Sequence, residues 1–156
     1  ERKTDVSHYN LGCICLLSYK ESLIMTSERD DRLIELRPEI SLGNENHTGD
    51  KPIGAFQNDV LRPILKFQNS IIIAQFKQYL IKFKPAFNAY NSQVQRNYIQ
   101  DVLKSDSRIK NSLIASVVSV MTLEEYSYYC ENKTEINKRI VVLLTKRIQD
   151  HLEMLF

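Results

Sequence analysis

Side chains suited to metal binding or acid–base catalysis are few and scattered in this 156-residue chain. Its three histidines, His8, His47 and His151, lie in three separate regions. Cys13–Cys15 forms a C-x-C pair, and the third cysteine, Cys130, follows two tyrosines in an expected helix, where a lone cysteine is usually a small packing residue. A zinc site needs three or four such ligands at defined spacing. We therefore predict no metal site and no cofactor.

Other patterns that accompany catalysis are incomplete as well. Gly43 and Gly49 are separated by five residues, and Asp50 occupies the place where a phosphate-binding loop needs lysine. Glu124 and Glu125 are adjacent, so on a helix their carboxylates point in different directions. We predict no catalytic residue, and expect a binding protein rather than an enzyme. An enzyme with an unrecognised site is retained as an alternative.

A mixed basic and aromatic stretch is the first candidate binding surface. Its four cations alternate with aromatic residues at helical spacing, a composition typical of grooves that bind single-stranded nucleic acid. The alternative is that the rings are core residues and the cations extend outward to solvent. The cations are Lys77, Lys82, Lys84 and Arg96, and the rings are Phe76, Tyr79, Phe83 and Tyr98.

Wide apolar stripes on two expected helices form the second candidate surface. A bundle of about 100 residues has a limited interior, so surplus apolar surface could be used for self-association or for a partner protein. The alternative is that both stripes are covered by the bundle's own core. The candidate interface residues are Ile71, Ile72, Phe76, Ile140, Leu144 and Ile148.

The elements that position these residues are helices. Apolar residues recur at spacings of three and four from residue 55 onward. The spacing predicts a helix from about 58 to 83, ended by Pro85, and a second from 92 to about 104. The spacing in residues 109–121 favours a helix, although their β-branched residues are also compatible with a strand. A short helix and a long C-terminal helix follow, so the prediction is an all-α bundle of about five helices.

Helix starts are indicated by capping residues. Ser92 with Gln95 and Thr122 with Glu125 both have the spacing of a capping box, in which two side chains bond reciprocally to helix amides. Thr134 is the expected N-cap of the last helix.

The region before the bundle has a different composition. All four glycines lie within residues 1–54, where 7 basic and 10 acidic side chains give a net charge of −3. Residues 55–156 carry 14 basic and 9 acidic side chains, a net charge of +5. We interpret 25–54 as a mostly irregular, flexible N-terminal arm containing one short helix, and 55–156 as the bundle. Residues 1–24 precede the first methionine, Met25, and we expect them to be upstream-translated sequence.

Several segments resemble a family of short, uncharacterised bacterial proteins. They are Gln57–Asn69, Tyr98-Ile99 with Lys104, Met121–Tyr126, and Asn137–Ile140 leading to Lys146-Arg147. The resemblance covers about residues 54–155 and implies a small helical protein. Some family members are labelled glyoxalase, but glyoxalase-type enzymes use βαβββ modules with paired His and Glu ligands, which this sequence does not contain.

The function predicted from the sequence is protein–protein interaction or regulation, by a cytoplasmic protein that forms a homodimer or binds a partner protein. No run of residues is long and apolar enough to be expected to span a membrane. The alternative is a weak nucleic-acid-binding protein.

Overall fold

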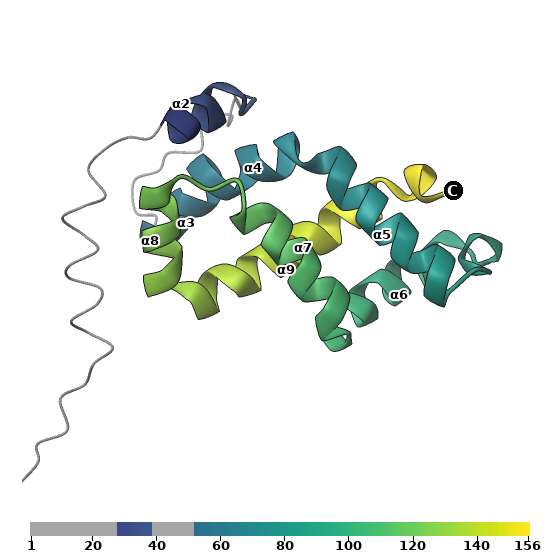
Figure 1. Cartoon of the computed structure of the whole chain (residues 1–156). Coiled ribbons are helices and arrows are strands. Elements are labelled where there is room, and N and C mark those ends of the chain that lie inside the picture. Colours follow the sequence, from purple (N-terminus) through teal and green to yellow (C-terminus); the bar gives the residue numbers. More distant parts are fainter. Residues whose placement is uncertain (1–27, 39–51) are drawn as a thin grey trace, which may run out of the picture.

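The computed structural model describes residues 28–38 and 52–156, and in these ranges it contains helices and no strands (Figure 1). The predicted all-α class is confirmed. Residues 1–27 and 39–51, which belong to the predicted upstream segment and arm, lie outside the described residues. The elements are α2 (Glu28–Glu35), α3 (Pro52–Phe56), the π-helix η1 (Gln57–Leu61), α4 (Arg62–Phe67), α5 (Asn69–Phe83), the 3₁₀ turn η2 (Phe87–Ala89), α6 (Ser92–Ser105), α7 (Ser107–Val118), α8 (Leu123–Glu131), α9 (Lys133–Asp150) and the 3₁₀ turn η3 (Leu152–Leu155).

The helix predicted from about 58 to 83 is present as consecutive segments rather than one smooth helix. The N–H of Arg62 bonds to the carbonyl of Gln57, five residues earlier, which closes the π turn of η1. Pro63 follows directly and has no N–H to continue the α-helical ladder, so the wider turn lies where the regular pattern is already interrupted. Gln68 breaks the path again between α4 and α5. Helix α5 ends at Phe83, with Lys84 as its C-cap, as expected from Pro85.

Two of the three predicted caps need correction. The N-cap of α6 is Asn91, whose side chain accepts the Val94 N–H, so the expected Ser92 box is wrong by one residue. Gln95 is buried instead and donates to the carbonyl of Phe87. The N-cap of α9 is residue 132, and not Thr134, because only one residue separates α8 from α9.

The third predicted cap is confirmed. Thr122 and Glu125 form the predicted capping box at the start of α8, with both reciprocal bonds present. Most of the segment 109–121, for which a strand was also considered, lies in the helix α7. Asp106 caps this helix by accepting the N–H of Arg108.

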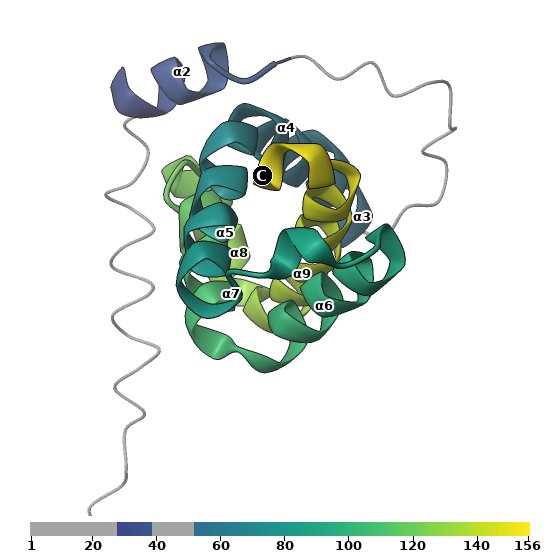
Figure 2. The ribbon, with the colours of Figure 1, turned by 90° about the vertical axis from the view of Figure 1, so that its right-hand side faces the viewer.

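The core is made by the apolar stripes of α4 to α9, and η3 packs against α5 at the C-terminal end. Helix α9 packs against α5, α6, α7 and α8, and the elements form a closed ring when viewed along the bundle (Figure 2). Burying one such aliphatic side chain contributes about 1.5–3 kcal/mol. The fully buried residues include Leu61, Ile64, Ile72, Phe76, Ile99, Leu113, Ile136, Ile140 and Leu144.

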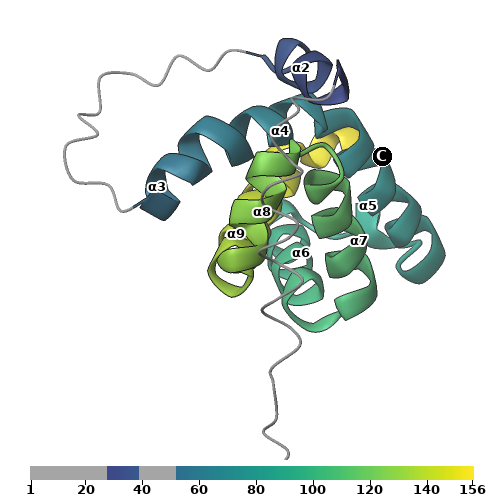
Figure 3. The ribbon, with the colours of Figure 1, turned by 60° about the vertical axis from the view of Figure 1, so that its left-hand side comes forward.

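Helix α2 lies outside this ring, beside α4 and above the connection between α7 and α8 (Figure 3). Its contribution to the core is small, because none of the buried apolar residues belongs to it. Among the described residues, no helix combines the length and the apolar character needed to cross a bilayer.

Candidate anion-binding pocket

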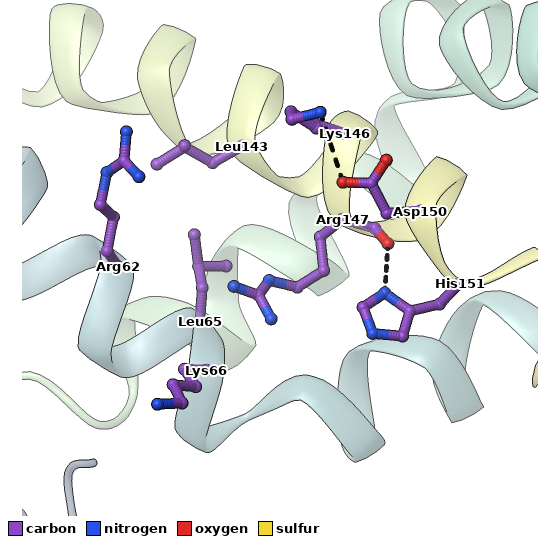
Figure 4. Close-up of a pocket in the computed structure, with 8 residues that line it drawn as sticks. All are labelled: Arg62, Leu65, Lys66, Leu143, Lys146, Arg147, Asp150 and His151. Carbon is purple, nitrogen blue, oxygen red and sulfur yellow. Dashed lines mark hydrogen bonds and ion pairs between the residues drawn. The ribbon is translucent and has the colours of Figure 1, made fainter. Parts of the chain in front are cut away.

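Two helices that are far apart in sequence bring their basic side chains to one pocket. Arg62 and Lys66 lie one turn apart on α4, and Lys146 and Arg147 lie near the C-terminal end of α9 (Figure 4). Residues four apart on a helix share a face, so the two α4 cations point to the same side. The pocket lies between α4 and α9, with the second pair across it from the first (Figure 4).

The pocket has a volume of about 300 Å³. Leu65 and Leu143 supply its apolar wall, and Asp150 and His151 complete the side formed by α9. Four cationic side chains and one carboxylate give it a net charge of three positive units when His151 is neutral. This excess of positive charge is the main chemical feature of the site.

Arg147 is the most enclosed of these cations. Its guanidinium extends from α9 toward α4, and it donates to the side-chain oxygen of Asn69 at 3.0 Å. Burial lowers the pKa of Arg147, and attraction to Asp150 opposes that shift. An arginine remains charged at neutral pH despite such a shift. A partly desolvated charge whose hydrogen-bond partner is a neutral amide is well placed to gain from an incoming anion.

The remaining α9 groups are oriented by local contacts. Lys146 and Asp150 form an i,i+4 ion pair at 3.4 Å. Nδ1 of His151 lies 2.8 Å from the carbonyl oxygen of Arg147, and because a carbonyl only accepts, Nδ1 carries the proton. Nε2 is then directed away from that bond. Arg62 has no ion-pair partner within the described ranges.

This arrangement of cations can bind an oxyanion. None of the side chains around the pocket is a serine, cysteine or threonine nucleophile. In the part of the chain that the structure describes, no group of three or more His, Cys, Asp or Glu side chains could hold a metal ion. Cys130 is exposed on α8, and its hydrogen bond with Tyr126 raises the pKa of that tyrosine.

The structure places the predicted basic and aromatic residues along α5 and α6 without forming one open groove. Lys77 donates to the main-chain oxygen of Phe156. Lys82 lies 5.3 Å from the ring of Phe83. Lys84 lies over two tyrosine rings, at 5.1 and 5.6 Å. These three cations therefore contact the chain's own groups. Two of them lie over rings on which nucleic-acid bases would have to stack.

Arg96, the fourth predicted cation, is partly buried on α6. Its main-chain carbonyl accepts a hydrogen bond from the side chain of Gln149 on α9. This contact ties α6 to α9 through the main chain of Arg96.

The candidate interface residues are mostly in the core. Ile72, Phe76, Ile140, Leu144 and Ile148 each have 0% exposure, because the bundle's own helices cover both stripes. These five residues cannot form a contact surface while the bundle is folded, which corrects the interface prediction for them.

The sixth residue, Ile71, is 52% exposed and remains available on the surface of α5. Phe67, one turn earlier at the end of α4, is 38% exposed. This apolar surface is small compared with the stripes from which it was predicted.

The pocket itself was missed by sequence reasoning. Arg62 with Lys66, and Lys146 with Asp150, have the spacing of residues on one helix face, and this spacing is a detectable signal. The sequence does not show that the two faces meet, because about 80 residues separate them.

No protein-family model, no curated protein and no solved structure matches this chain. The resemblance to a family of short bacterial proteins therefore stays a prediction, and the functional conclusion depends on the pocket.

Proposed function

We propose that this chain is an interaction module, and that its binding site is the pocket between α4 and α9. The ligand is an oxyanion, a phosphate or carboxylate group that a partner carries. The observation that supports this proposal is the convergence of Arg62, Lys66, Lys146 and Arg147 around about 300 Å³, with Asp150 as the one carboxylate among the lining residues.

The dimensions of the pocket favour one anionic group rather than a polymer. A volume of about 300 Å³ is at the small end of the range for ligand sites. None of the residues around it is phenylalanine, tyrosine or tryptophan, whereas single-stranded nucleic acid is bound by several such rings along a basic groove. A single phosphate or carboxylate at the end of a side chain or small molecule fits better.

Each cation has a distinct role in this proposal. Arg147 is enclosed and gains most from the ligand, because a charge-assisted bond inside a partly desolvated site is stronger than one at the surface. Arg62 offers a planar fork that matches two oxygens of a carboxylate or phosphate. Lys66 adds a point charge. Leu65 and Leu143 contact the carbon atoms that carry the anionic group.

The proposal is tested by titrating the protein with inorganic phosphate and, separately, with acetate, while backbone amide shifts are recorded by NMR. We expect shifts at the α4 and α9 residues that line the pocket. Arg147→Met should weaken binding at least tenfold, because it removes a charged hydrogen-bond donor worth about 1.5–3 kcal/mol.

Lys104→Met is the matched control, since Lys104 is an exposed lysine on α6 away from the pocket. It should change the dissociation constant less than twofold. Equal weakening by the two variants would mean that phosphate senses only the net charge of the protein, and the proposed site would be wrong.

A further inference from the structure

The residues 28–38, here called the α2 segment, are attached to the turn between α7 and α8 by charged side chains. This turn, residues 119–125, is called the α7–α8 corner. Arg29 donates to the carbonyl oxygen of Ser119 at 2.8 Å and to that of Met121 at 3.1 Å. Carbonyls at the end of a helix lack partners within the helix, so this arginine supplies the missing donors.

Two further contacts complete the attachment. Arg37 donates to both carboxylate oxygens of Glu125, at 2.5 and 2.8 Å, and to the carbonyl of Val120 at 2.8 Å. Asp30 accepts the N–H of Leu123 at 2.9 Å. That N–H is the first of α8 and has no partner within its own helix. Negative charge at a helix N-terminus and positive charge at a C-terminus are both stabilising.

Three of these charges are largely removed from water, whereas the side chain of Arg29 is 50% exposed. The Arg37 side chain is 9% exposed and that of Glu125 is 16% exposed, and Asp30 is buried. Removing one member of such a pair leaves the other charged, desolvated and unpaired, which is strongly unfavourable. The charges of the α2 segment therefore complement the carboxylate, carbonyl and N–H groups of the corner.

Apolar burial contributes little to the attachment. Leu33 is partly buried, whereas Ile34 and Leu36 remain exposed. The core of the bundle is complete without the α2 segment, since its buried apolar residues all belong to 52–156. The segment is thus joined to the bundle by complementary charge and by its covalent connection.

The covalent connection favours the corner of the same chain, but only up to the local concentration that it provides. The contacting residues are 83 to 93 positions apart in sequence. The 13 residues 39–51 that connect the α2 segment to α3 can span at most about 45 Å. A connection of this length raises the local concentration of the segment to about the millimolar range. The same contacts can form between two copies.

We propose that the α7–α8 corner is a docking surface whose second occupant is the α2 segment of another copy of this chain. Two copies then exchange segments, and each corner receives the arginines and the aspartate that it receives in the structure. Exchange of an identical element preserves every contact and generates a two-fold dimer at low cost. The charge complementarity of Arg37 with Glu125 selects this occupant.

Charge reversal tests the exchange in full-length protein. One copy carries Arg37→Glu and the other carries Glu125→Arg, so neither can form the ion pair within its own chain. In an exchanged mixed dimer, the unchanged Arg37 meets the unchanged Glu125, and the two reversed residues meet each other. We expect each variant alone to be monomeric and the equimolar mixture to show twice the molar mass by light scattering.

The same substitutions combined in one chain provide the control. This double variant restores the pair within the chain and should regain slow hydrogen exchange at the Leu123 amide. If the double variant regains that protection while the mixture keeps the mass of a monomer, docking is restricted to one chain and the proposal is overturned.

A second measurement does not depend on reversing Glu125, which also caps α8. Native mass spectrometry of mixed ¹⁴N- and ¹⁵N-labelled wild-type protein should detect mixed dimers as the concentration approaches about 1 mM. Arg37→Met should abolish them, and Arg32→Met should not, because Arg32 pairs only with Glu28 on the exposed side of α2. Absence of dimers, or dimers that persist in Arg37→Met, would contradict the exchange.

Discussion

The α7–α8 corner and the α4–α9 pocket are both rich in arginine, but the two regions use it in opposite ways. In the corner, Arg37 is buried and donates to a carboxylate and a carbonyl. In the pocket, Arg62 is exposed and has no ion-pair partner among the described residues, and Arg147 donates to a neutral amide. The corner is electrostatically complete, whereas the pocket carries an excess of positive charge.

This difference separates charges that stabilise the fold from charges that are available to a ligand. Breaking a buried, paired charge destabilises a protein, because the remaining partner is left without compensation. Gathering like charges around an open pocket opposes folding slightly through mutual repulsion, and that repulsion is relieved when an anion binds. Substitutions in the two regions should therefore differ in both size and sign.

The largest effect is expected at the corner, from Glu125→Gln. The substitution removes the negative charge that pairs with Arg37 and replaces one of the two carboxylate oxygens with an NH2 group, which cannot accept from Arg37. The remaining amide oxygen can still accept the N–H of Thr122. We expect the free energy of unfolding to fall by about 2–3 kcal/mol, because the part-buried guanidinium of Arg37 is left without its counter-charge.

Urea unfolding followed by circular dichroism measures this change. Glu124→Gln is the matched control, since Glu124 is the exposed neighbour in the same helix turn. It should change stability by less than about 0.5 kcal/mol. A similar loss in both variants would show that the first turn of α8 senses only its net charge, and the corner would not be the paired site described.

The corner also illustrates what can be predicted from sequence. The capping box of Thr122 and Glu125 was predicted, because its two residues are three apart and act within one turn. The pairing of the same Glu125 with Arg37 was not, since 88 residues separate them and no local pattern records the contact. The fold class depends on local periodicity and was predicted well. Both charged sites depend on how distant helices pack, and were not.

The errors in helix starts have a similar cause. Asn91 and Ser92 are both good capping residues, and the sequence pattern does not distinguish a cap at one from a cap at the other. The choice depends on Gln95, whose side chain turns inward and donates to the carbonyl of Phe87. Gln95 is therefore not available to form a capping box with Ser92. A tertiary contact thus decides a local boundary.

An intermediate case lies at the α6–α7 junction, where an exposed arginine pairs with a partly buried carboxylate. Asp106 accepts from Arg108 and from the hydroxyl of Tyr79 at 3.1 Å. The hydrogen bond from Arg108 is the main cause that holds the pKa of Asp106 below its ordinary value. Burial, followed by the hydrogen bond to Asp106, raises the pKa of Tyr79 to about 12.

This shift predicts a loss of stability at high pH. The tyrosine pKa in the folded protein is about 12, above the ordinary 10.0, so the folded state keeps its proton after the unfolded state has released it. The contribution is fully present below pH 10 and is lost as the pH rises from 10 through 12. Tyr79→Phe should show a shallower decline in unfolding free energy across this range. A decline as steep as that of the wild type would place its cause elsewhere.

The smallest effect, and the reversed sign, are expected in the pocket. Arg62→Met removes an exposed cation from beside Lys66 and Arg147, and leaves no buried partner unpaired. At low salt we expect the unfolding free energy to stay within about 0.5 kcal/mol of the wild type and to shift toward greater stability, since a repulsion is relieved. Added salt should cancel the difference because it screens the repulsion.

Inorganic phosphate should raise the melting temperature of the wild type more than that of Arg62→Met, because the variant has lost part of the site. If Arg62→Met is destabilised as strongly as Glu125→Gln, this arginine supports the fold as Arg37 does, and the pocket no longer contrasts with the corner.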